Sequence, residues 1–133
     1  MTGSLSGFLT AARTLSRDPV WRQLSVRRLV TMIQRTLLRQ MQWAVFEPND
    51  ARLRDEVQRL LQSYLRQLFQ ANAFRGRTVS ESYFVVCDET LNTPQVVDSG
   101  ALVCHVGIAP AEPLEFIVLH LSRDGDGTLL MEE

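Results

Sequence analysis

Lysine is missing from this chain, and all fourteen basic residues are arginine. Guanidinium groups form fixed, forked contacts with carboxylates, so this choice favours defined contacts over a loosely solvated surface, although genome composition can produce the same bias. Long apolar runs are missing too, and no stretch reaches the roughly 18 residues of a membrane helix. Residues 1–7 have neither the basic start nor the long apolar stretch of a secretion signal. We therefore expect a soluble, unexported protein with no membrane partner.

Residues that support catalysis or bind metals are few. Cys87 and Cys104 cannot make a disulfide framework, and both lie among strand-forming residues, where a small buried hydrophobe is the usual role. Cys104 and His105 are adjacent, so a strand would point them to opposite faces and away from a shared metal site. His105 and His120 lack a nearby acid pair or nucleophile signature and are interpreted as structural. With no glycine-rich phosphate loop either, the sequence predicts neither an enzyme nor a cofactor or metal site.

The segment Asp124-Gly125-Asp126-Gly127 begins like a calcium-binding loop. The glycine expected at the sixth position of such a loop is replaced by Leu129, and no helical pattern follows. A hairpin or linker turn is therefore the favoured interpretation.

The net charge of −1 conceals an uneven distribution along the chain. Residues 1–77 hold thirteen arginines and five acidic residues, whereas residues 78–133 hold ten acidic residues and a single arginine, Arg123. One interpretation is a subunit with a basic helical face and an acidic sheet end, which would attract copies of itself head to tail. The alternative is that each half solvates its own face. We do not expect a nucleic acid partner, because the arginines are interspersed with apolar residues and no RNA-binding aromatic strand or zinc finger accompanies them.

Two long amphipathic helices are predicted from apolar residues that recur every three or four positions. The first spans Val26 to Met41, and residues 1–25 precede it as a partly flexible segment. The second begins after Asn49 or Asp50, either of which can cap it, and Gly76 is a suitable end. The arginines on the polar side of the first helix are Arg27, Arg28, Arg35 and Arg39.

Four strands are predicted around the second helix. Trp43 to Phe46 is too short for a helix and rich in aromatic and branched residues, so we interpret it as a buried strand. Tyr83 to Cys87 follows the helix, and Leu102 to Ile108 and Glu115 to Leu121 follow a loop in which a proline starts a short helix and a glycine ends it. The first two strands would form a parallel crossover. The fold class is α/β (α+β): a two-layer sandwich in which two long amphipathic helices pack on a small mixed sheet.

Separated motifs in a fixed order give the chain a resemblance to a known family, from about Ala12 to Leu121. Early motifs are Ala12-Arg13-Thr14-Leu15-Ser16, Asp18-Pro19-x-Trp21 and Val26-Arg27-Arg28-Leu29. Later ones include Trp43, Phe46, Glu47, Pro48, Asn49 and Asp50, then Gly107, Pro110, Pro113, Glu115 and Phe116. On these residues the chain resembles the C-terminal domain of contractile tail sheath proteins of phages and related injection particles. Gly107 would let the strand bend or a neighbour approach, while Pro110 and Pro113 would protect a sheet edge from unwanted pairing.

The resemblance implies a structural subunit that assembles around a tail tube, with extended arms of neighbouring subunits adding strands to its sheet. This β-augmentation keeps subunits connected while the sheath shortens. Residues 26–121 would be the sheath domain, and residues 122–133 a donated arm with Leu129, Leu130 and Met131 as its anchors. Arg27, Arg28, Arg35 and Arg39 would contact the tube or the next ring.

The partners that the resemblance implies are other copies or a full-length sheath protein, together with the inner tail tube protein. Assembly would take place in the bacterial cytoplasm, as part of a phage tail or contractile injection particle. The alternative from another class is an adaptor or terminator that binds one end of the sheath in the same particle.

Overall fold

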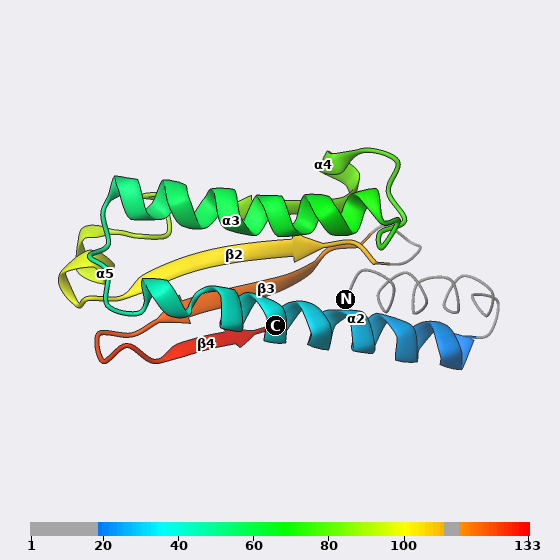
Figure 1. The fold of residues 1–133 in the computed structure, drawn as a ribbon, viewed down its shortest axis with the longest axis horizontal. Helices are drawn as coiled ribbons and strands as arrows, with labels where there is room; N and C mark the ends of the chain where they lie inside the picture. The colour runs from blue at the N-terminus through cyan, green and yellow to red at the C-terminus, as the bar shows by residue number, and fades with distance from the viewer. Residues whose placement is uncertain (1–18, 111–114) are drawn as a thin grey trace.

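The computed structural model describes residues 19–110 and 115–133, and Figure 1 shows how their helices and strands are arranged. The α+β class is confirmed, with two long helices and a four-stranded sheet. The elements in chain order are α2 (Pro19–Gln40), the 3-10 helix η1 (Gln42–Ala44), α3 (Ala51–Gln70), α4 (Val79–Ser82), β1 (Tyr83–Val86), α5 (Pro94–Asp98), β2 (Leu102–Ile108), β3 (Ile117–Arg123) and β4 (Leu129–Glu132).

Helix α2 confirms the first amphipathic pattern and extends it toward the N-terminus. It begins at Pro19, because proline is well suited to the first turn of a helix, where its missing N–H is not needed. Residues 19–25, assigned above to the N-terminal segment, belong to this helix, whereas residues 1–18 lie outside the described residues. Ile33 and Leu37 are fully buried and Arg35 is exposed, as the helical period predicts.

Two predicted helix starts are confirmed by their capping hydrogen bonds. The Asp50 carboxylate accepts a hydrogen bond from the Leu53 amide at 2.8 Å, so Asp50 is the cap of α3. The short helix α5 begins with Thr93 as its cap and Pro94 at its first position. Gly100, with φ of 79°, follows its end in the left-handed conformation that glycine adopts at little cost.

The predicted end of α3 at Gly76 is wrong, because the helix ends at Gln70. Asn72 has φ of 63° and is the left-handed residue that stops the helix. The Ala73 amide donates to the Leu68 carbonyl at 2.9 Å, and the Asn72 amide donates to the Phe69 carbonyl at 3.0 Å. This is a Schellman arrangement, in which asparagine takes the place more often held by glycine.

The sheet is an antiparallel meander in the order β1-β2-β3-β4. Strands β2 and β3 pair along their whole length, from Leu102 opposite Arg123 to Ile108 opposite Ile117. The mixed sheet and the parallel crossover predicted from the sequence are therefore wrong for the described residues, since each strand pair there is antiparallel. The cause is the segment before α3, which is not a strand.

Residues Trp43 to Phe46 form a tight turn and not the buried strand that was predicted. The 3-10 helix η1 covers Gln42 to Ala44, and the Ala44 amide donates to the Met41 carbonyl at 3.0 Å. Ala44 is buried, whereas 42% of Trp43 and 85% of Phe46 is exposed. A short apolar run does not distinguish strand from helical turn, and the need to reverse the chain between α2 and α3 decides in favour of the turn.

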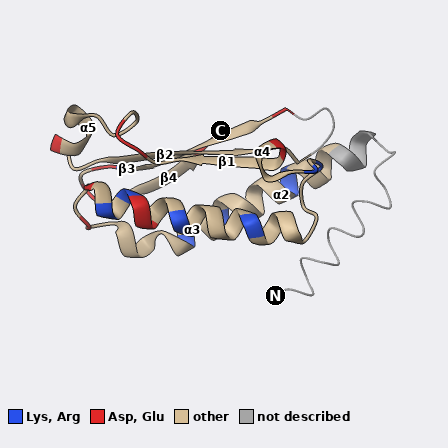
Figure 2. Cartoon of the chain, turned by 90° about the horizontal axis from the view of Figure 1, so that it is seen from above, with Lys and Arg blue, Asp and Glu red and all other residues tan. Residues whose placement is uncertain are grey.

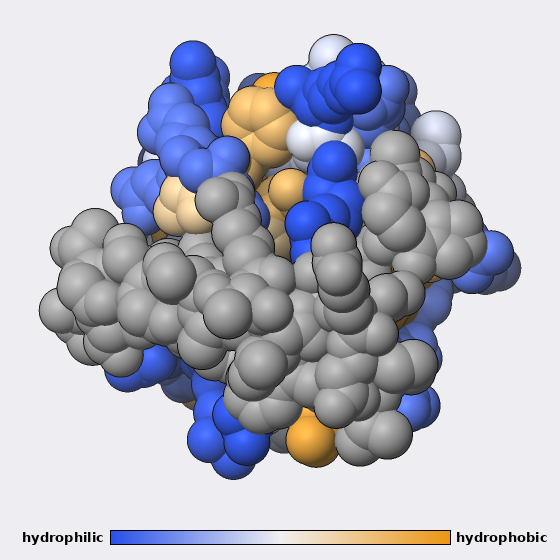
Figure 3. All heavy atoms as spheres, turned by 90° about the vertical axis from the view of Figure 1, so that its right-hand side faces the viewer, coloured by the Kyte–Doolittle hydropathy of each residue, from blue (hydrophilic) through white to orange (hydrophobic). Residues whose placement is uncertain are grey.

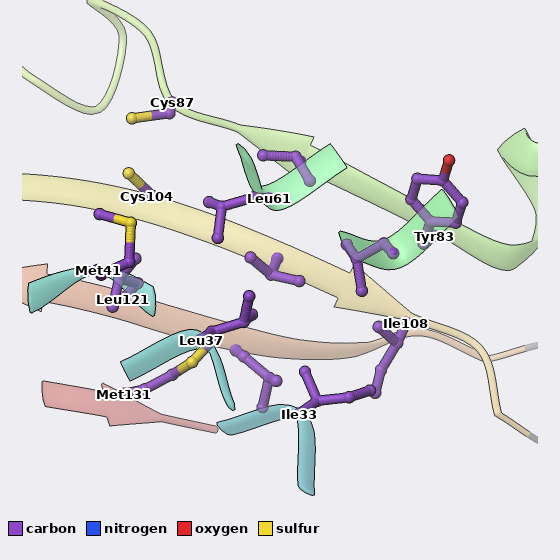
Figure 4. Packing of buried hydrophobic residues seen from close by; sticks show 14 of the residues in the cluster. Ile33, Leu37, Met41, Leu61, Tyr83, Cys87, Cys104, Ile108, Leu121 and Met131 are labelled. Atoms are coloured by element: carbon purple, nitrogen blue, oxygen red, sulfur yellow. The ribbon is translucent and has the colours of Figure 1, made fainter. Parts of the chain in front are cut away.

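Helices α2 and α3 lie side by side on one face of the sheet, as Figures 1 and 2 show from two directions. Their apolar stripes pack on every second residue of the strands to make a single core. Figure 4 shows this packing, in which Ile33 and Leu37 of α2, Met41 directly after it and Leu61 of α3 approach Ile108, Leu121 and Met131 of the strands.

Cys87 and Cys104 point toward one another at one end of this core (Figure 4). Both thiols are free and buried, which confirms the role of small buried hydrophobes that the sequence predicted. A hydrogen bond with Cys87, together with burial, raises the pKa of the Cys104 thiol, so this group stays protonated at physiological pH.

Residues 122–133 fold back on their own sheet in this structure, and their donation to a neighbouring subunit stays a prediction. Ser122 and Arg123 complete β3, and β4 pairs with β3 in the same chain. Met131 is buried in the core, because the segment covers apolar surface of its own body. Between the strands, the Asp124 carboxylate accepts hydrogen bonds from the amides of Asp126 and Thr128 at 2.9 and 3.0 Å, which confirms the hairpin turn.

Candidate subunit-interaction surfaces

Arg123 is a buried cation at the end of the sheet where the β3–β4 hairpin lies. It stands on the core face of β3, in alternation with two leucines, and is 3% exposed. Its guanidinium group donates hydrogen bonds to the carbonyls of Ala44 at 2.7 Å, Glu47 at 2.6 Å and Gly100 at 2.9 Å. Burial lowers the pKa of Arg123, and the charge of Glu47 opposes this shift. One side chain thus ties β3 to the α2–α3 connection and to the turn before β2.

Two buried asparagines fix the same end of the molecule. The Asn49 amide group donates to Oδ1 of Asn92 at 3.0 Å and to the Ala101 carbonyl at 2.8 Å, while its oxygen accepts from Arg54 at 2.8 Å. The Asn92 side chain donates to the Val103 carbonyl and accepts from the Val103 amide, both at 2.9 Å. It takes the place that a longer β1 would occupy beside β2. The predicted motif residue Asn49 is therefore a structural link between the start of α3 and β2.

Trp43 and Phe46 are two exposed aromatic residues of this fixed connection, and we call them the aromatic knob. The Phe46 ring contacts the hairpin at Gly127. A Cβ atom added to Gly127 would lie 2.8 Å from Phe46 Cε1 and 2.7 Å from Val45 Cγ1. Gly127 also has φ of 86°, so both space and backbone favour glycine there. The acidic residues nearest to Phe46 and Gly127 in sequence are Glu47 on the connection and Asp124 and Asp126 on the hairpin.

The outward side of α2 carries the four arginines predicted to contact partners. They line a shallow hollow of ≈ 460 Å³, which we call the arginine hollow. Arg27 pairs with Glu133 at 2.5 Å, and both side chains are about half exposed. The apolar residues of the hollow include Leu24, which is 45% exposed. The described residues that line the hollow are Leu24, Arg27, Arg28, Thr31, Met32, Arg35, Thr36 and Arg39.

Charge is therefore unevenly distributed in space as well as in sequence. Figure 2 shows most basic residues along α2 and α3, and acidic residues in the loops near α5, on α3 and beside α4. Figure 3 shows the end of the molecule away from α5, where hydrophilic side chains surround small apolar areas. The described part of the chain thus has a basic helical side and an acidic end.

The sheet face opposite the helices holds two ring pairs. The Phe84 ring lies over Gly107, and a Cβ atom added to Gly107 would be 1.9 Å from that ring. Phe84 also packs on Phe116, with ring centres 5.1 Å apart. Gly107 therefore makes room for a neighbouring side chain of its own sheet. His105 and His120 pair across β2 and β3 with ring centres 4.4 Å apart. Burial, and secondarily the charge of His120, lowers the pKa of His105.

The remaining predicted motif residues are scattered around the end of β2. Pro110 directly follows Ala109, whose amide donates to the Ser82 carbonyl at 2.9 Å beyond the last β1–β2 pair. Glu115 is exposed just before β3, and Pro113 lies outside the described residues. Protection of a sheet edge by these prolines stays a prediction.

Sequence reasoning missed Arg123 and Asn92 as organising residues. Arg123 had a usable signal, because it continues the alternation of core residues along β3. Asn92 had none, since a buried loop asparagine is recognised only by the backbone groups it meets in space. Within residues 19–110 and 115–133, no group of three or more potential metal ligands is found. The helices of these residues include none long and apolar enough to cross a membrane.

The fold and these surfaces define a two-layer α+β domain whose distinctive exposed features are charged and aromatic interaction surfaces. The model of the phage tail sheath C-terminal domain matches residues 16–122. The match includes all of α2 and α3 and the first two strands, together with nearly all of β3. The chain belongs to the phage tail sheath C-terminal domain family.

Curated relatives and solved structures agree with this family. The chain is 32% identical over 105 residues to the tail sheath protein of Enterobacteria phage T4, and 27% identical over 107 residues to that of Vibrio phage KVP40. These matches cover 79% and 78% of the chain. Among solved structures, an anti-feeding prophage baseplate contains a similar chain with a TM-score of 0.65 and 35% identity over 75% of this chain. The PVC sheath complex of an extracellular contractile injection system, in its contracted state, contains one with a TM-score of 0.63 and 33% identity over 70%.

The chain spans only a small part of these relatives. It matches 15% of the length of each tail sheath protein, and 28% and 27% of the two chains in the solved structures. Functions of the whole relatives therefore reach this chain only as proposals.

Proposed function

We propose that this chain is a structural subunit of a contractile sheath, which assembles around the tail tube of a phage tail or injection particle. The observation that carries the proposal is the family match over residues 16–122, which includes both long helices and most of the sheet. The similar chain in a contracted sheath complex supports it. The partners would be other copies or a longer sheath protein, and the inner tube protein, with assembly in the bacterial cytoplasm.

Exchange of β4 between subunits is the connection that we propose within such a sheath. In the isolated chain, β4 forms the sheet edge and pairs Leu129 with Arg123 and Met131 with Leu121. The same pairings can form between two chains if the hairpin opens at residues 124–128, because exchanged elements reuse their own contacts. Leu129, Leu130 and Met131 would then anchor the strand in a neighbour, as in other cases of β-augmentation.

A pair of engineered cysteines distinguishes exchange from folding back. Ser122 and Leu130 lie opposite each other in β3 and β4, on the face away from the helices. The double variant Ser122→Cys/Leu130→Cys should form an internal bridge in the isolated chain and a ladder of covalent multimers after assembly. Each single variant is the control. Internal bridges alone in the assembled state would rule out exchange.

The arginines of α2 are proposed to contact either the tube or the next ring. Their outward position on an otherwise well-packed helix supports this role, since charges there contribute little to folding. Contacts of exposed arginines with acidic surfaces would be weakened by salt.

Assembly with a full-length sheath protein tests the proposed function. A tagged form of this chain, produced together with a related sheath protein, should be incorporated along the length of ordered tubes seen by electron microscopy. A truncation ending at Arg123 removes β4 and should not be incorporated stably. Tubes that exclude the complete tagged chain would contradict the proposal.

A sheath-end adaptor or terminator is a second candidate. The observation that favours it is the similar chain in a structure described as a baseplate, which lies at the end of a particle. In the same experiment, an adaptor would appear as a single layer at tube ends and would not be incorporated along their length.

A further inference from the structure

The aromatic knob is an exposed apolar feature on a rigid support. Phe46 is 85% exposed, yet the backbone on either side of it is held by the hydrogen bonds of Arg123 to Ala44 and Glu47. Large exposed aromatic side chains are enriched among the residues that dominate protein interfaces. A support that is already fixed lowers the entropy lost on binding. The knob therefore has the properties of an anchor for a partner.

Acidic residues restrict the partner of the knob. Glu47 follows Phe46 directly, and Asp126 lies next to Gly127, on which the Phe46 ring leans. Asp126 is exposed, whereas the Asp124 carboxylate caps the hairpin turn. A partner must therefore offer an apolar recess surrounded by positive charge.

The arginine hollow on α2 offers such a recess. Leu24 and Met32 supply apolar surface, and Arg27, Arg28, Arg35 and Arg39 surround it, in a volume of ≈ 460 Å³. Guanidinium groups suit this place because they form forked contacts with carboxylates and stack on aromatic rings. In charge and in polarity, the hollow is complementary to the knob.

We propose that the aromatic knob of one copy docks into the arginine hollow of a second copy. This inference rests on the proposed sheath function and names a subunit interface for it. Phe46 inserts against Leu24 and Met32, while the acidic rim pairs with the arginines of α2. The two surfaces are different regions of the chain, so the contact is heterologous and passes from copy to copy in one direction.

Single variants of each surface test the contact in solution. Phe46→Ser removes the anchor, and Arg35→Glu reverses a charge in the hollow. Each should weaken self-association, measured by sedimentation velocity over a concentration series at low salt, by at least about tenfold. Val79→Ser, at a residue 45% exposed on α4, is the matched apolar control, and Arg66→Glu on α3 is the charge control. Both controls should associate like the unaltered chain, and circular dichroism verifies that all variants are folded.

A mixture of the two impaired variants gives the sharpest result. The Phe46→Ser chain keeps an intact hollow, and the Arg35→Glu chain keeps an intact knob. Mixed together they should form a one-to-one complex that does not grow further, although neither associates alone. The double charge swap Arg35→Glu/Asp126→Arg in one chain should restore part of the association that Arg35→Glu alone removes.

Several results would overturn the inference. These are an unaltered chain that remains monomeric at all concentrations, a mixture that fails to form the complex, or controls as impaired as the test variants. Loss of binding to tube protein alone, with self-association unchanged, would assign the hollow to the tube instead and would equally refute the contact. Incorporation of the Phe46→Ser and Arg35→Glu chains into sheath tubes at normal levels would refute this interface while leaving the proposed sheath function intact.

Discussion

Arginine serves opposite purposes in two regions of this molecule. At the acidic end, Arg123 is buried and donates hydrogen bonds to three backbone carbonyls that belong to two separate segments. On α2, Arg35 and Arg39 are exposed beside the arginine hollow. A charge removed from water contributes to folding only when hydrogen bonds offset much of its lost hydration, whereas an exposed charge contributes mainly to recognition. The comparison separates the residues that build the domain from those available to a partner.

The largest effect is expected from Arg123→Met. This change removes the hydrogen-bond donor of the Ala44, Glu47 and Gly100 carbonyls, of which Ala44 is buried, and should lower the free energy of unfolding by about 3 kcal/mol or more. Urea denaturation measures the loss. Arg35→Met is the matched control on α2 and should change stability by about 0.5 kcal/mol or less. Equal losses of stability at the two positions would contradict the assignment of Arg123 to folding and Arg35 to recognition.

Asn92→Ala should have the next largest effect. The substitution removes the side chain that bonds both backbone groups of Val103 and also accepts from Asn49. A loss of about 2 kcal/mol in urea denaturation is expected, since buried polar groups are left without partners. Gln62→Ala, on the exposed side of α3, is the control. An unchanged stability of the Asn92 variant would show that water replaces the amide and that the acidic end is not rigid.

Asn72→Ala should cost less, because it affects a single backbone conformation outside both regions. Alanine tolerates φ of 63° less well than asparagine does, and about 1 kcal/mol should be lost. Asn72→Gly should retain or slightly raise the stability, since glycine has no Cβ to strain. Thermal unfolding of the two variants measures the difference. The same loss in both would mean that the Asn72 side chain, and not its φ, stops the helix.

The smallest effect concerns pH and the histidine pair on the open sheet face. The pKa of His105 is lowered in the folded state, so the unfolded chain binds the proton more readily. Stability should therefore fall as the pH drops below about 6.5 and level off once His105 is protonated in the folded state. Solvent screening keeps the effect to about 0.5 kcal/mol or less. His120→Gln should reduce the part of this pH dependence that comes from charge repulsion between the two histidines. Thermal melts at several pH values measure the dependence. A stability that rises as the pH drops below about 6.5 would contradict the prediction.

The sequence allowed the two long helices, the N-terminal cap of α3 and the central strand to be predicted, because these depend on neighbours along the chain. Strand β2 has the predicted bounds, and Asp50 caps α3 as expected. The turn at Trp43 to Phe46 could not be predicted, since a short apolar run fits several conformations until the packing of both helices decides. That one error produced the wrong parallel crossover.

The candidate surfaces, too, could be predicted only where they depend on neighbours along the chain. The arginines of α2 were predicted from helical periodicity alone, and they line one hollow in the structure. The exposure of Phe46 and the burial of Arg123 were not predicted, because both depend on segments that are distant in the sequence. Hydrophobicity placed Phe46 in the core, whereas nothing in the sequence signalled the three carbonyls that meet at Arg123 in space.

Immunogold labelling of mixed sheath tubes tests the central claim most directly. The tagged chain is produced with a related full-length sheath protein, and the positions of the label on the tubes are recorded by electron microscopy. The account predicts regular label along the whole length of the tubes, with loss of label for the truncation ending at Arg123. Tubes that carry no label, although the tagged chain is folded and abundant in the same cells, would contradict it.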